Sequence, residues 1–314
     1  MNAFGQSLAV AIDCPAKINL GLQVHHRRPA DSYHYISSIF IPISFKDQIR
    51  VFASDRDQLR SIVDLPEPAR ADYALVSEHG DYQRNLLWRL LEATRAWRQA
   101  GPDQGRSACL GLEIHKNIPG GAGLGGGSSD AGRLLAWMRS YYDWPRQAVA
   151  ELALQLGADV PFFLQKEPSL VYGIGELYEP VAVGPGFGIL VWPGVTVNTA
   201  KAYQFLKRTL QNDPPLKSIR GLDTEALLAL RESRWHQLTG LDNDFEEPVF
   251  ALHPLLGRIK ADLQGTGCDL AAMSGSGSSI FGLCATQHNR DVAIEAIARD
   301  YPEALVVPFE FPAG

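Results

Sequence analysis

A glycine-rich segment at residues 119–131, with the sequence PGGAGLGGGSSDA, constrains the fold of this 314-residue chain more than any other feature. Six of the eight residues 120–127 are glycine. The preceding residues 109–116 alternate apolar with other side chains, which predicts a strand. Apolar residues in 130–142 recur at helical spacing, which predicts a helix. The glycines therefore join a strand to the N-terminus of a helix.

A junction of this kind favours an anion. Backbone N–H groups at the start of a helix have no intrahelical partner, and the helix dipole is positive at that end. Glycine allows a positive φ and a close approach of the backbone to a ligand. Ordering six glycines costs backbone entropy, and a merely structural turn gives no reason for that cost. The segment is therefore predicted to hold phosphate through backbone N–H groups.

Two familiar phosphate-binding motifs can be tested against this segment. The P-loop is excluded, because no lysine follows the glycines. The dinucleotide fingerprint G-x-G-x-x-G matches at Gly121, Gly123 and Gly126, but a strand with an acidic residue should follow the helix. Residues 146–156 instead predict a second helix. A dinucleotide-binding fold is therefore a distant alternative.

Composition and charge limit the class of protein. The formal net charge is -6, so no basic footprint for nucleic acid is present. No apolar run approaches the roughly 20 residues that cross a bilayer, and the first ten residues lack a signal-peptide pattern. The cysteines form no C-x-x-C pair and lie at positions 14, 109, 268 and 284. We expect a cytoplasmic protein with reduced thiols and no zinc site.

The remaining pattern mixes strands and helices without a strict alternation, which predicts an α+β fold with helices packed on largely antiparallel sheets. Further strands are expected at 9–24, 35–45, 169–172, 188–192, 270–273, 279–283 and 304–307. Further helices are expected at 85–97, 200–210, 223–230, 290–299 and 245–263, the last interrupted by Pro248 and Pro254. Residues 55–84 are polar and interrupted by prolines, which predicts a variable surface excursion. A domain division is expected near residue 165.

Two other segments carry chemistry. Lys17 and Asn19 are two positions apart in a predicted strand, so both side chains point to one face. The alternative is that Lys17 is an edge-strand charge that discourages aggregation. Asp159 follows a predicted helix and precedes apolar residues, where a carboxylate is unfavourable unless paired. It is either a general base near a cation or an ordinary turn aspartate.

With these residues in place, the chain resembles the GHMP kinase superfamily and, within it, the 4-diphosphocytidyl-2-C-methyl-D-erythritol kinase family. The superfamily resemblance rests on Pro-Ala-Lys at 15–17, the glycine segment 119–131, and Met-Ser-Gly-Ser-Gly-Ser-Ser at 273–279. The family resemblance rests on motifs at 15–20, 30–34, 125–131, 156–161 and 243–244. Family members usually have glycine where this chain has Ser32, so the turn before Tyr33 and His34 would be strained if it needs a positive φ.

The resemblance implies a two-domain GHMP kinase fold with the active-site cleft between the domains. Residues 1–165 would be the N-terminal ATP-binding domain and 166–314 the C-terminal domain. The enzyme would transfer the γ-phosphoryl group of ATP, with Mg²⁺, to the 2-hydroxyl of 4-diphosphocytidyl-2-C-methyl-D-erythritol in isoprenoid biosynthesis. The partners would be small molecules only, and the protein a monomer or weak homodimer. The alternatives are a homoserine or mevalonate kinase, or a non-catalytic nucleotide-binding module.

The resemblance also implies roles for individual residues. Asp159 would take the proton of the attacking hydroxyl and Lys17 would stabilise charge beside it. The ATP-binding residues would be Asn85, Leu86, Pro119, Gly120, Gly121, Gly123, Leu124, Gly125, Gly126, Gly127, Ser128 and Ser129. The substrate-binding residues would be Asn19, Tyr33, His34, Thr199, Tyr203 and Gly275. Asn85 is equally well interpreted as a helix N-cap and Tyr203 as a core residue; no metal ligand is assigned.

Overall fold

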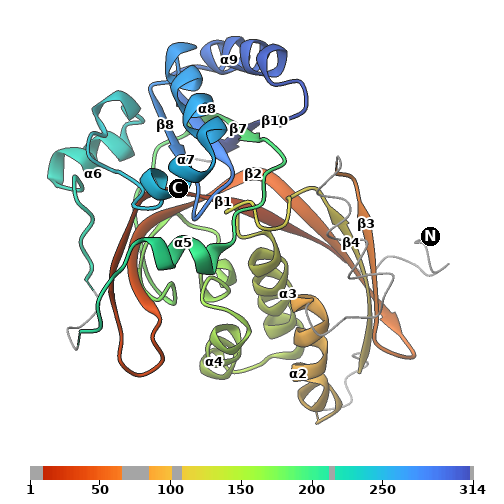
Figure 1. Ribbon diagram of the computed structural model, residues 1–314. Helices are drawn as coiled ribbons and strands as arrows, with labels where there is room; N and C mark the ends of the chain where they lie inside the picture. Colours follow the sequence, from red (N-terminus) through yellow and green to blue (C-terminus); the bar gives the residue numbers. More distant parts are fainter. Residues whose placement is uncertain (1–9, 66–84, 101–107, 212–215, 312–314) are drawn as a thin grey trace. The chain divides into compact units, whose positions relative to one another are not determined.

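The computed structural model describes residues 10–65, 85–100, 108–211 and 216–311 (Figure 1). These residues form two compact units. Unit 1 comprises the described residues up to Ala16, from Lys46 to Gly120 and from Gly125 to Lys166. Unit 2 comprises Lys17–Phe45, Gly121–Leu124 and the described residues from Glu167 onward. Two long strands, β1 (Val10–Arg27) and β2 (His34–Ser54), contribute residues to both units.

Unit 1 packs helices on a small mixed sheet. The C-terminal part of β2 pairs antiparallel with β4 (Cys109–Lys116), which pairs in parallel with β3 (Gln58–Val63). Three helices pack against one another: α2 (Leu86–Ala100), α3 (Gly126–Tyr142) and α4 (Arg146–Leu156) (Figure 1). The core is built from the apolar faces of these elements, as the helical spacing of residues such as Leu134 and Met138 predicts.

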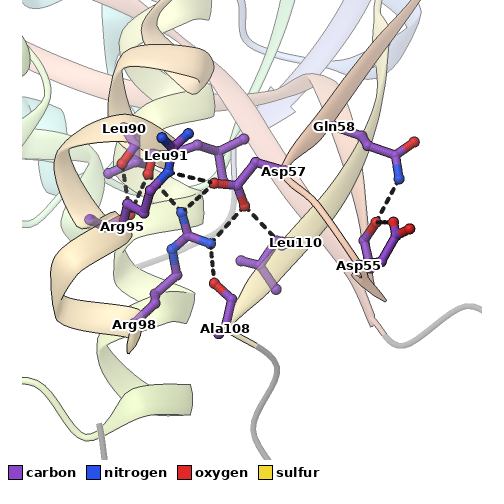
Figure 2. Close-up of polar contacts among 11 residues, drawn as sticks. Asp55, Asp57, Gln58, Leu90, Leu91, Arg95, Arg98, Ala108 and Leu110 are labelled. Atoms are coloured by element: carbon purple, nitrogen blue, oxygen red, sulfur yellow. Dashed lines mark hydrogen bonds and ion pairs between the residues drawn. The ribbon is translucent and has the colours of Figure 1, made fainter. Parts of the chain in front are cut away.

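A buried ion pair fixes the C-terminal turn of α2 to the sheet (Figure 2). Arg98 donates to both carboxylate oxygens of Asp57, at 2.7 and 2.9 Å, and to the carbonyl oxygens of Leu91 and Ala108. The amide of Leu110 donates to the same carboxylate. Burial alone would raise the pKa of Asp57, but the hydrogen bonds from Arg98 and Leu110 bring it below its usual value.

Asp57 and β3 correct one expectation from the sequence. Part of the polar segment 55–84, expected to be a surface excursion, is a strand of the sheet with a buried carboxylate at its start. β3 was not predicted because residues 55–84 are polar as a whole, and most side chains of β3 are only half-buried. Residues 66–84 lie outside the described residues, as does the N-terminal segment 1–9.

Unit 2 contains two sheet portions. The N-terminal part of β2 pairs antiparallel with β5 (Ser169–Gly173), and β5 with β6 (Leu177–Pro180). The second is a four-stranded antiparallel sheet, which follows the order β10 (Leu305–Phe311), β7 (Gly186–Trp192), β9 (Ile280–Cys284) and β8 (Leu270–Met273).

The helices of unit 2 include two that cover the four-stranded sheet. α8 (Pro254–Gly265) contacts β8 and β9, and α9 (Gln287–Asp300) contacts β7 and β10 (Figure 1). The other helices are α5 (Thr199–Phe205), α6 (Thr224–Arg231) and α7 (Glu246–Leu252). One-turn 3₁₀ segments lie at Pro161–Leu164 in unit 1 and Trp235–Gln237 in unit 2.

The expected α+β class is confirmed, and most expected elements form within a few residues of their predicted ends. The helical stretch expected over 245–263 is divided at Pro254, as expected, because Pro254 cannot continue the hydrogen-bond ladder of α7. Pro248, also expected to interrupt it, lies in the first turn of α7. The helix expected over 200–210 ends at Phe205, and Lys207 adopts a left-handed φ of 49° just beyond it. Across the described residues, no helix is long and apolar enough to span a membrane.

Candidate functional site

The glycine-rich segment adopts the backbone conformation that its composition predicts. Gly121, Gly123 and Gly125 have φ values of 65°, 78° and 70°, which side-chain-bearing residues rarely adopt. A Cβ at Gly123 would lie 2.0 Å from the carbonyl oxygen of Ser274. The close approach of these two backbones therefore requires glycine. Residues 121–124 belong to unit 2 and the residues from Gly125 onward to unit 1.

In unit 1, the segment leads directly into α3. The helix begins at Gly126, not at residue 130 as expected, so Gly126, Gly127 and both serines lie in its first turn. Its N-cap, Gly125, offers no side-chain acceptor, whereas Asn85 caps α2 as the sequence allows. The amides of the first three helical residues have no carbonyl oxygen of α3 as a partner, because the first such bond runs from the amide of Ser129 to Gly125. These amides are suited to an anionic ligand.

The N-terminus of α3 lies near the start of α2, where Asn85 and Leu86 are expected to bind ATP. A Cβ at Gly127 would lie 3.7 Å from Cδ1 of Leu86, so the first turns of α2 and α3 are in contact range within unit 1. Gly127 is exposed, and Ser128 is half-buried. Ser129 is fully buried, and its hydroxyl has no hydrogen-bond partner among the described residues.

Beneath the first turn of α3 lies a buried group of charges that sequence reasoning missed, Asp47, Lys116 and Asp130, here called the acidic clasp. The ammonium of Lys116 pairs with Asp47 and lies 2.7 Å from Asp130. Asp47 also accepts hydrogen bonds from the amides of Asn117 (2.6 Å) and Ile118 (2.9 Å). The clasp therefore ties the residues just before the glycine segment to the helix that follows it.

Two carboxylates share one lysine in the acidic clasp, and this arrangement shifts the pKa of Asp130. Burial raises the pKa of Asp130 to about 7, and the charge of Asp47 raises it as well, while Lys116 opposes both. One oxygen of Asp130 has no hydrogen-bond partner among the described residues. The only sequence signal was an aspartate directly after Ser128 and Ser129, 14 positions beyond a lysine that ends a buried strand.

In unit 2, Lys17 lies at the centre of a second polar network. Its side chain is only 3% exposed, so the alternative of an edge-strand charge is wrong. The ammonium donates to Asn19 and, at 2.9 Å, to the carbonyl oxygen of Gly123, and it lies 4.8 Å from the ring centre of Phe40. Asn19 in turn donates to Ser38. Lys17 and Asn19 therefore share one face, as their spacing predicts.

The turn between β8 and β9 closes this network. The hydroxyl of Ser274 donates to the carbonyl oxygen of Gly123 at 3.0 Å, and the amide of Ser279 donates to the carbonyl oxygen of Ala122 at 3.2 Å. The side-chain amide of Asn243 donates to the carbonyl oxygens of Met273 and Gly275, both at 2.8 Å, and so fixes the backbone of the turn. Three motifs that are far apart in the sequence thus meet within unit 2.

The expected nucleobase contacts lie elsewhere in unit 2. The rings of His34 and Tyr203 stack directly, with centres 4.7 Å apart and 23° between their planes, and Tyr203 also meets Phe245 edge-on. A base cannot lie between His34 and Tyr203 until the rings separate, since two stacked layers need about twice the distance of one. Tyr33 is 58% exposed and faces Arg28.

Ser32 has a φ of 64°, so the turn before Tyr33 does use the left-handed conformation that glycine would adopt without strain. The turn is closed by two backbone hydrogen bonds, from the amide of Arg28 to the carbonyl oxygen of Tyr33 and from the amide of Ser32 to the carbonyl oxygen of Arg28. An ion pair between Arg28 and Asp31 adds to them.

The other residues predicted for the site are Asp159, Thr199 and several positions in and before the glycine segment. Asp159 is half-buried in the turn between α4 and the 3₁₀ segment of unit 1, beside buried Val160 and Phe162. Thr199 begins α5 in unit 2, and its hydroxyl lies 2.9 Å from that of Ser276. Of the residues before and within the glycine segment, Pro119 and Leu124 are buried, and Gly120 is half-buried.

Comparison with family models and solved structures identifies the class of enzyme to which the chain belongs. A family model described as the GHMP kinases N terminal domain matches residues 85–167, and one described as GHMP kinases C terminal matches residues 219–303. A crystal structure of an L. major mevalonate kinase, 14% identical, shares the fold with a TM-score of 0.62 over 98% of this chain and 99% of that one. The chain has the architecture of a GHMP kinase.

Closer relatives narrow the class. A 4-diphosphocytidyl-2-C-methyl-D-erythritol kinase of Leptospira biflexa is 32% identical over 94% of this chain and 97% of its own length. One of Parabacteroides distasonis is 37% identical over 85% and 89%. A crystal structure of 4-(cytidine 5'-diphospho)-2C-methyl-D-erythritol kinase, 28% identical, covers 97% of this chain and 100% of that one with a TM-score of 0.71. The chain belongs to the 4-diphosphocytidyl-2-C-methyl-D-erythritol kinase family.

Proposed function

We propose that the protein is an ATP-dependent kinase that phosphorylates the 2-hydroxyl of 4-diphosphocytidyl-2-C-methyl-D-erythritol in isoprenoid biosynthesis. The observation that carries the proposal is identity of 32% and 37% to relatives of that name over most of both chains. The geometry supports the same class of reaction, because the glycine-rich segment leads into a helix with no side-chain N-cap, and its Gly123 accepts a hydrogen bond from a buried lysine.

The phosphates of ATP would bind at the first turn of α3. The amides of Gly126, Gly127 and Ser128 are unpaired within the helix, and the helix dipole adds a partial positive charge there. Leu86 and Asn85 at the start of α2 would contact the adenine. This arrangement supplies charge neutralisation and positioning, which are the main requirements of phosphoryl transfer.

Lys17 would stabilise the negative charge of the transferring phosphoryl group. Its ammonium is held by two oxygen acceptors, the side chain of Asn19 and the carbonyl of Gly123, so its position is fixed before substrate binds. A preorganised charge in a water-poor site stabilises a transition state more than a mobile one does. Asn19 would in addition orient the methylerythritol end of the substrate, and Gly275 would approach it through its backbone.

Asp159 would act as the general base. Its apolar neighbours limit competing water, and a carboxylate that accepts the proton of the attacking hydroxyl contributes about 10²- to 10⁴-fold to such reactions. Replacement by asparagine keeps the shape of the turn and deletes the base. We expect Asp159→Asn to lower kcat by about 10²-fold or more, with little change in ATP affinity.

Mg²⁺ would accompany ATP. Among the described residues, no group of three or more His, Cys, Asp or Glu side chains is arranged to hold a metal ion. The buried hydroxyl of Ser129 has no hydrogen-bond partner in the described part of the chain, which fits a site in which the ion is held mainly by the phosphates of the nucleotide, with few protein ligands. When bound, Mg²⁺ would neutralise phosphate charge. Ser128 and Ser129 are the candidates for the protein ligand.

The cytidine end of the substrate would be recognised by Tyr33, His34 and Tyr203. Aromatic faces stack on any base, and hydrogen-bonding groups of the turn would select cytosine. Thr199, at the start of the helix that carries Tyr203, would contact the same ligand. The stacked pair His34 and Tyr203 would have to open for the base to insert between them. We place the reaction in the cytoplasm, with residues 1–165 as the ATP-binding domain and 166–314 as the second domain.

The test is an ADP-release assay with three acceptors, 4-diphosphocytidyl-2-C-methyl-D-erythritol, mevalonate and homoserine. We expect turnover with the cytidine-containing acceptor alone. Turnover only with mevalonate or homoserine would assign the chain to another GHMP kinase activity, and ATP binding without turnover of any acceptor would favour a nucleotide-binding module. Asp159→Asn is compared with Asp143→Asn, an exposed aspartate at a left-handed position that asparagine also tolerates. Equal activity of these two variants would remove Asp159 from the mechanism.

A further inference from the structure

Two free thiols lie against each other at the base of a hairpin in unit 2. Cys268 follows α8, and Cys284 is the last residue of β9, 16 positions further along the chain. Their sulfur atoms are 3.2 Å apart, within hydrogen-bonding distance. Both side chains are buried, with Cys268 6% and Cys284 0% exposed. The proposed kinase reaction uses neither thiol.

The sheet register holds the pair in place. β8 and β9 are antiparallel, and the amide of Asp269 donates to the carbonyl oxygen of Leu283 at 2.8 Å, which fixes the backbone between the two cysteines. A Cβ at Gly282 would lie 2.6 Å from the sulfur of Cys268. The absence of a side chain at Gly282 therefore leaves the space in which Cys268 reaches across β9 toward Cys284.

The hydrogen bond between the two thiols also shifts their pKa values in opposite directions. The hydrogen bond with Cys268 lowers the pKa of Cys284 despite its burial. The same hydrogen bond, together with burial, raises the pKa of Cys268. A thiolate is the nucleophilic form of cysteine, and either sulfur can donate in this contact, so one thiol of the pair supplies the attacking thiolate and the other acts as the resolving thiol.

We propose that Cys268 and Cys284 are a redox-sensitive pair that forms a reversible disulfide when the protein meets a hydroperoxide. The thiolate of one cysteine attacks a peroxide oxygen, the O–O bond breaks, and a sulfenic acid and hydroxide result. The sulfur of the other cysteine then displaces the sulfenic oxygen as water. The hydroxide takes up the proton that the first thiol released. In total, two thiols and one hydrogen peroxide give one disulfide and two waters, and an external dithiol reverses the oxidation.

The disulfide would close the base of the β8–β9 hairpin. The tip of that hairpin carries Ser274, which donates to the carbonyl oxygen of Gly123, and Gly275, whose carbonyl accepts from Asn243. A cross-link over this length of chain restricts the unfolded state and so stabilises the fold. Oxidation would thus strengthen the hairpin that supports the glycine segment, whether or not the proposed kinase assignment holds.

The experiment oxidises the full-length, reduced protein with hydrogen peroxide, then blocks remaining thiols with iodoacetamide under denaturing conditions. Peptide mass spectrometry without reduction should find the peptides of Cys268 and Cys284 joined with the loss of two hydrogens, and dithiothreitol should separate them. The oxidised protein should unfold at a temperature higher than the reduced protein by about 5–10 °C. Cys109→Ser, which changes a half-buried cysteine of unit 1, should retain both results.

Two outcomes would overturn the proposal. In the first, both thiols stay open to alkylation after peroxide treatment, or proceed to sulfinic acid without forming a cross-link. In the second, Cys284→Ser or Cys268→Ala keeps the peroxide-induced rise in unfolding temperature, so that the rise has another origin. The mass measurement on the unmodified chain needs neither variant, so a variant that fails to fold leaves the proposal testable.

Discussion

Asp130→Asn tests the acidic clasp, because it removes one titrating group from beneath α3 and keeps the side-chain shape. The pKa of Asp130 is raised to about 7 in the folded protein, against roughly 3.9 in an unfolded chain. Between these values the folded state binds more protons than the unfolded state. The contribution of Asp130 to stability is therefore present in full below about pH 4 and lost as the pH rises through about 7.

The size of the effect follows from the two pKa values. Between about pH 5 and about pH 8, the titration of Asp130 alone lowers the free energy of unfolding by roughly 2–3 kcal/mol. Asparagine cannot ionise, so Asp130→Asn lacks this loss, while Lys116 keeps its partner Asp47. We expect the wild-type protein to lose about 2–3 kcal/mol more than the variant over this pH range. The titrating groups outside the acidic clasp are common to both proteins and cancel in the comparison, whereas Asp47 and Lys116 interact with Asp130.

The measurement is urea denaturation of both proteins at the two pH values, followed by tryptophan fluorescence. Four of the six tryptophans, at positions 88, 97, 137 and 144, lie in unit 1 with the acidic clasp, so the signal reports mainly on that unit. Asp143→Asn, at an exposed position after α3, is the matched control and should follow the wild-type protein. If Asp130→Asn shows the wild-type pH dependence to within about 0.5 kcal/mol, Asp130 is ionised throughout the range and the reasoning fails.

Three further predictions concern single contacts. Lys17→Met should lower kcat by about 10²-fold or more while ATP still binds, and a variant with wild-type kcat in the ADP-release assay would exclude the lysine from catalysis. Gly123→Ala places a Cβ 2.0 Å from the carbonyl oxygen of Ser274 at a positive φ, so ATP affinity measured by calorimetry should fall; unchanged affinity would place the phosphates elsewhere. Arg98→Met leaves buried Asp57 without its main partner and should cost about 3–5 kcal/mol in urea denaturation. An Arg98→Met loss under about 1 kcal/mol would show that the ion pair does not stabilise the fold. In the wild-type protein the pKa of Asp57 is lowered by folding, so the stability that Asp57 contributes should decline as the pH falls below about 4.

Local chemistry made the glycine segment predictable. Positive φ at Gly121, Gly123 and Gly125 follows from the absence of side chains, and the shared face of Lys17 and Asn19 follows from strand periodicity. The start of α3 was placed four residues too late, because glycine and serine weaken the helical pattern in the very turn suited to anion binding.

Long-range pairings were not predictable from the pattern of residues. Asp47 lies 69 positions before Lys116, and nothing in the polar run around it distinguishes a buried carboxylate from a surface one. The stacking of His34 in β2 on Tyr203 in α5 is a second long-range contact, and no sequence pattern indicates that these two residues meet. Such contacts are determined by the tertiary fold, whereas turns and strand faces are determined by neighbours in sequence.

The pairing of β2 with β5 bears on how the gene can be divided. Residues 36–40 of β2 pair with Ser169–Gly173, so a fragment that stops at residue 165 would carry these residues without the strand they hydrogen-bond to. An unpaired, apolar strand edge recruits other chains, and such a fragment would be expected to aggregate when expressed alone. A split intended for complementation or separate expression has to leave β5 with the N-terminal piece.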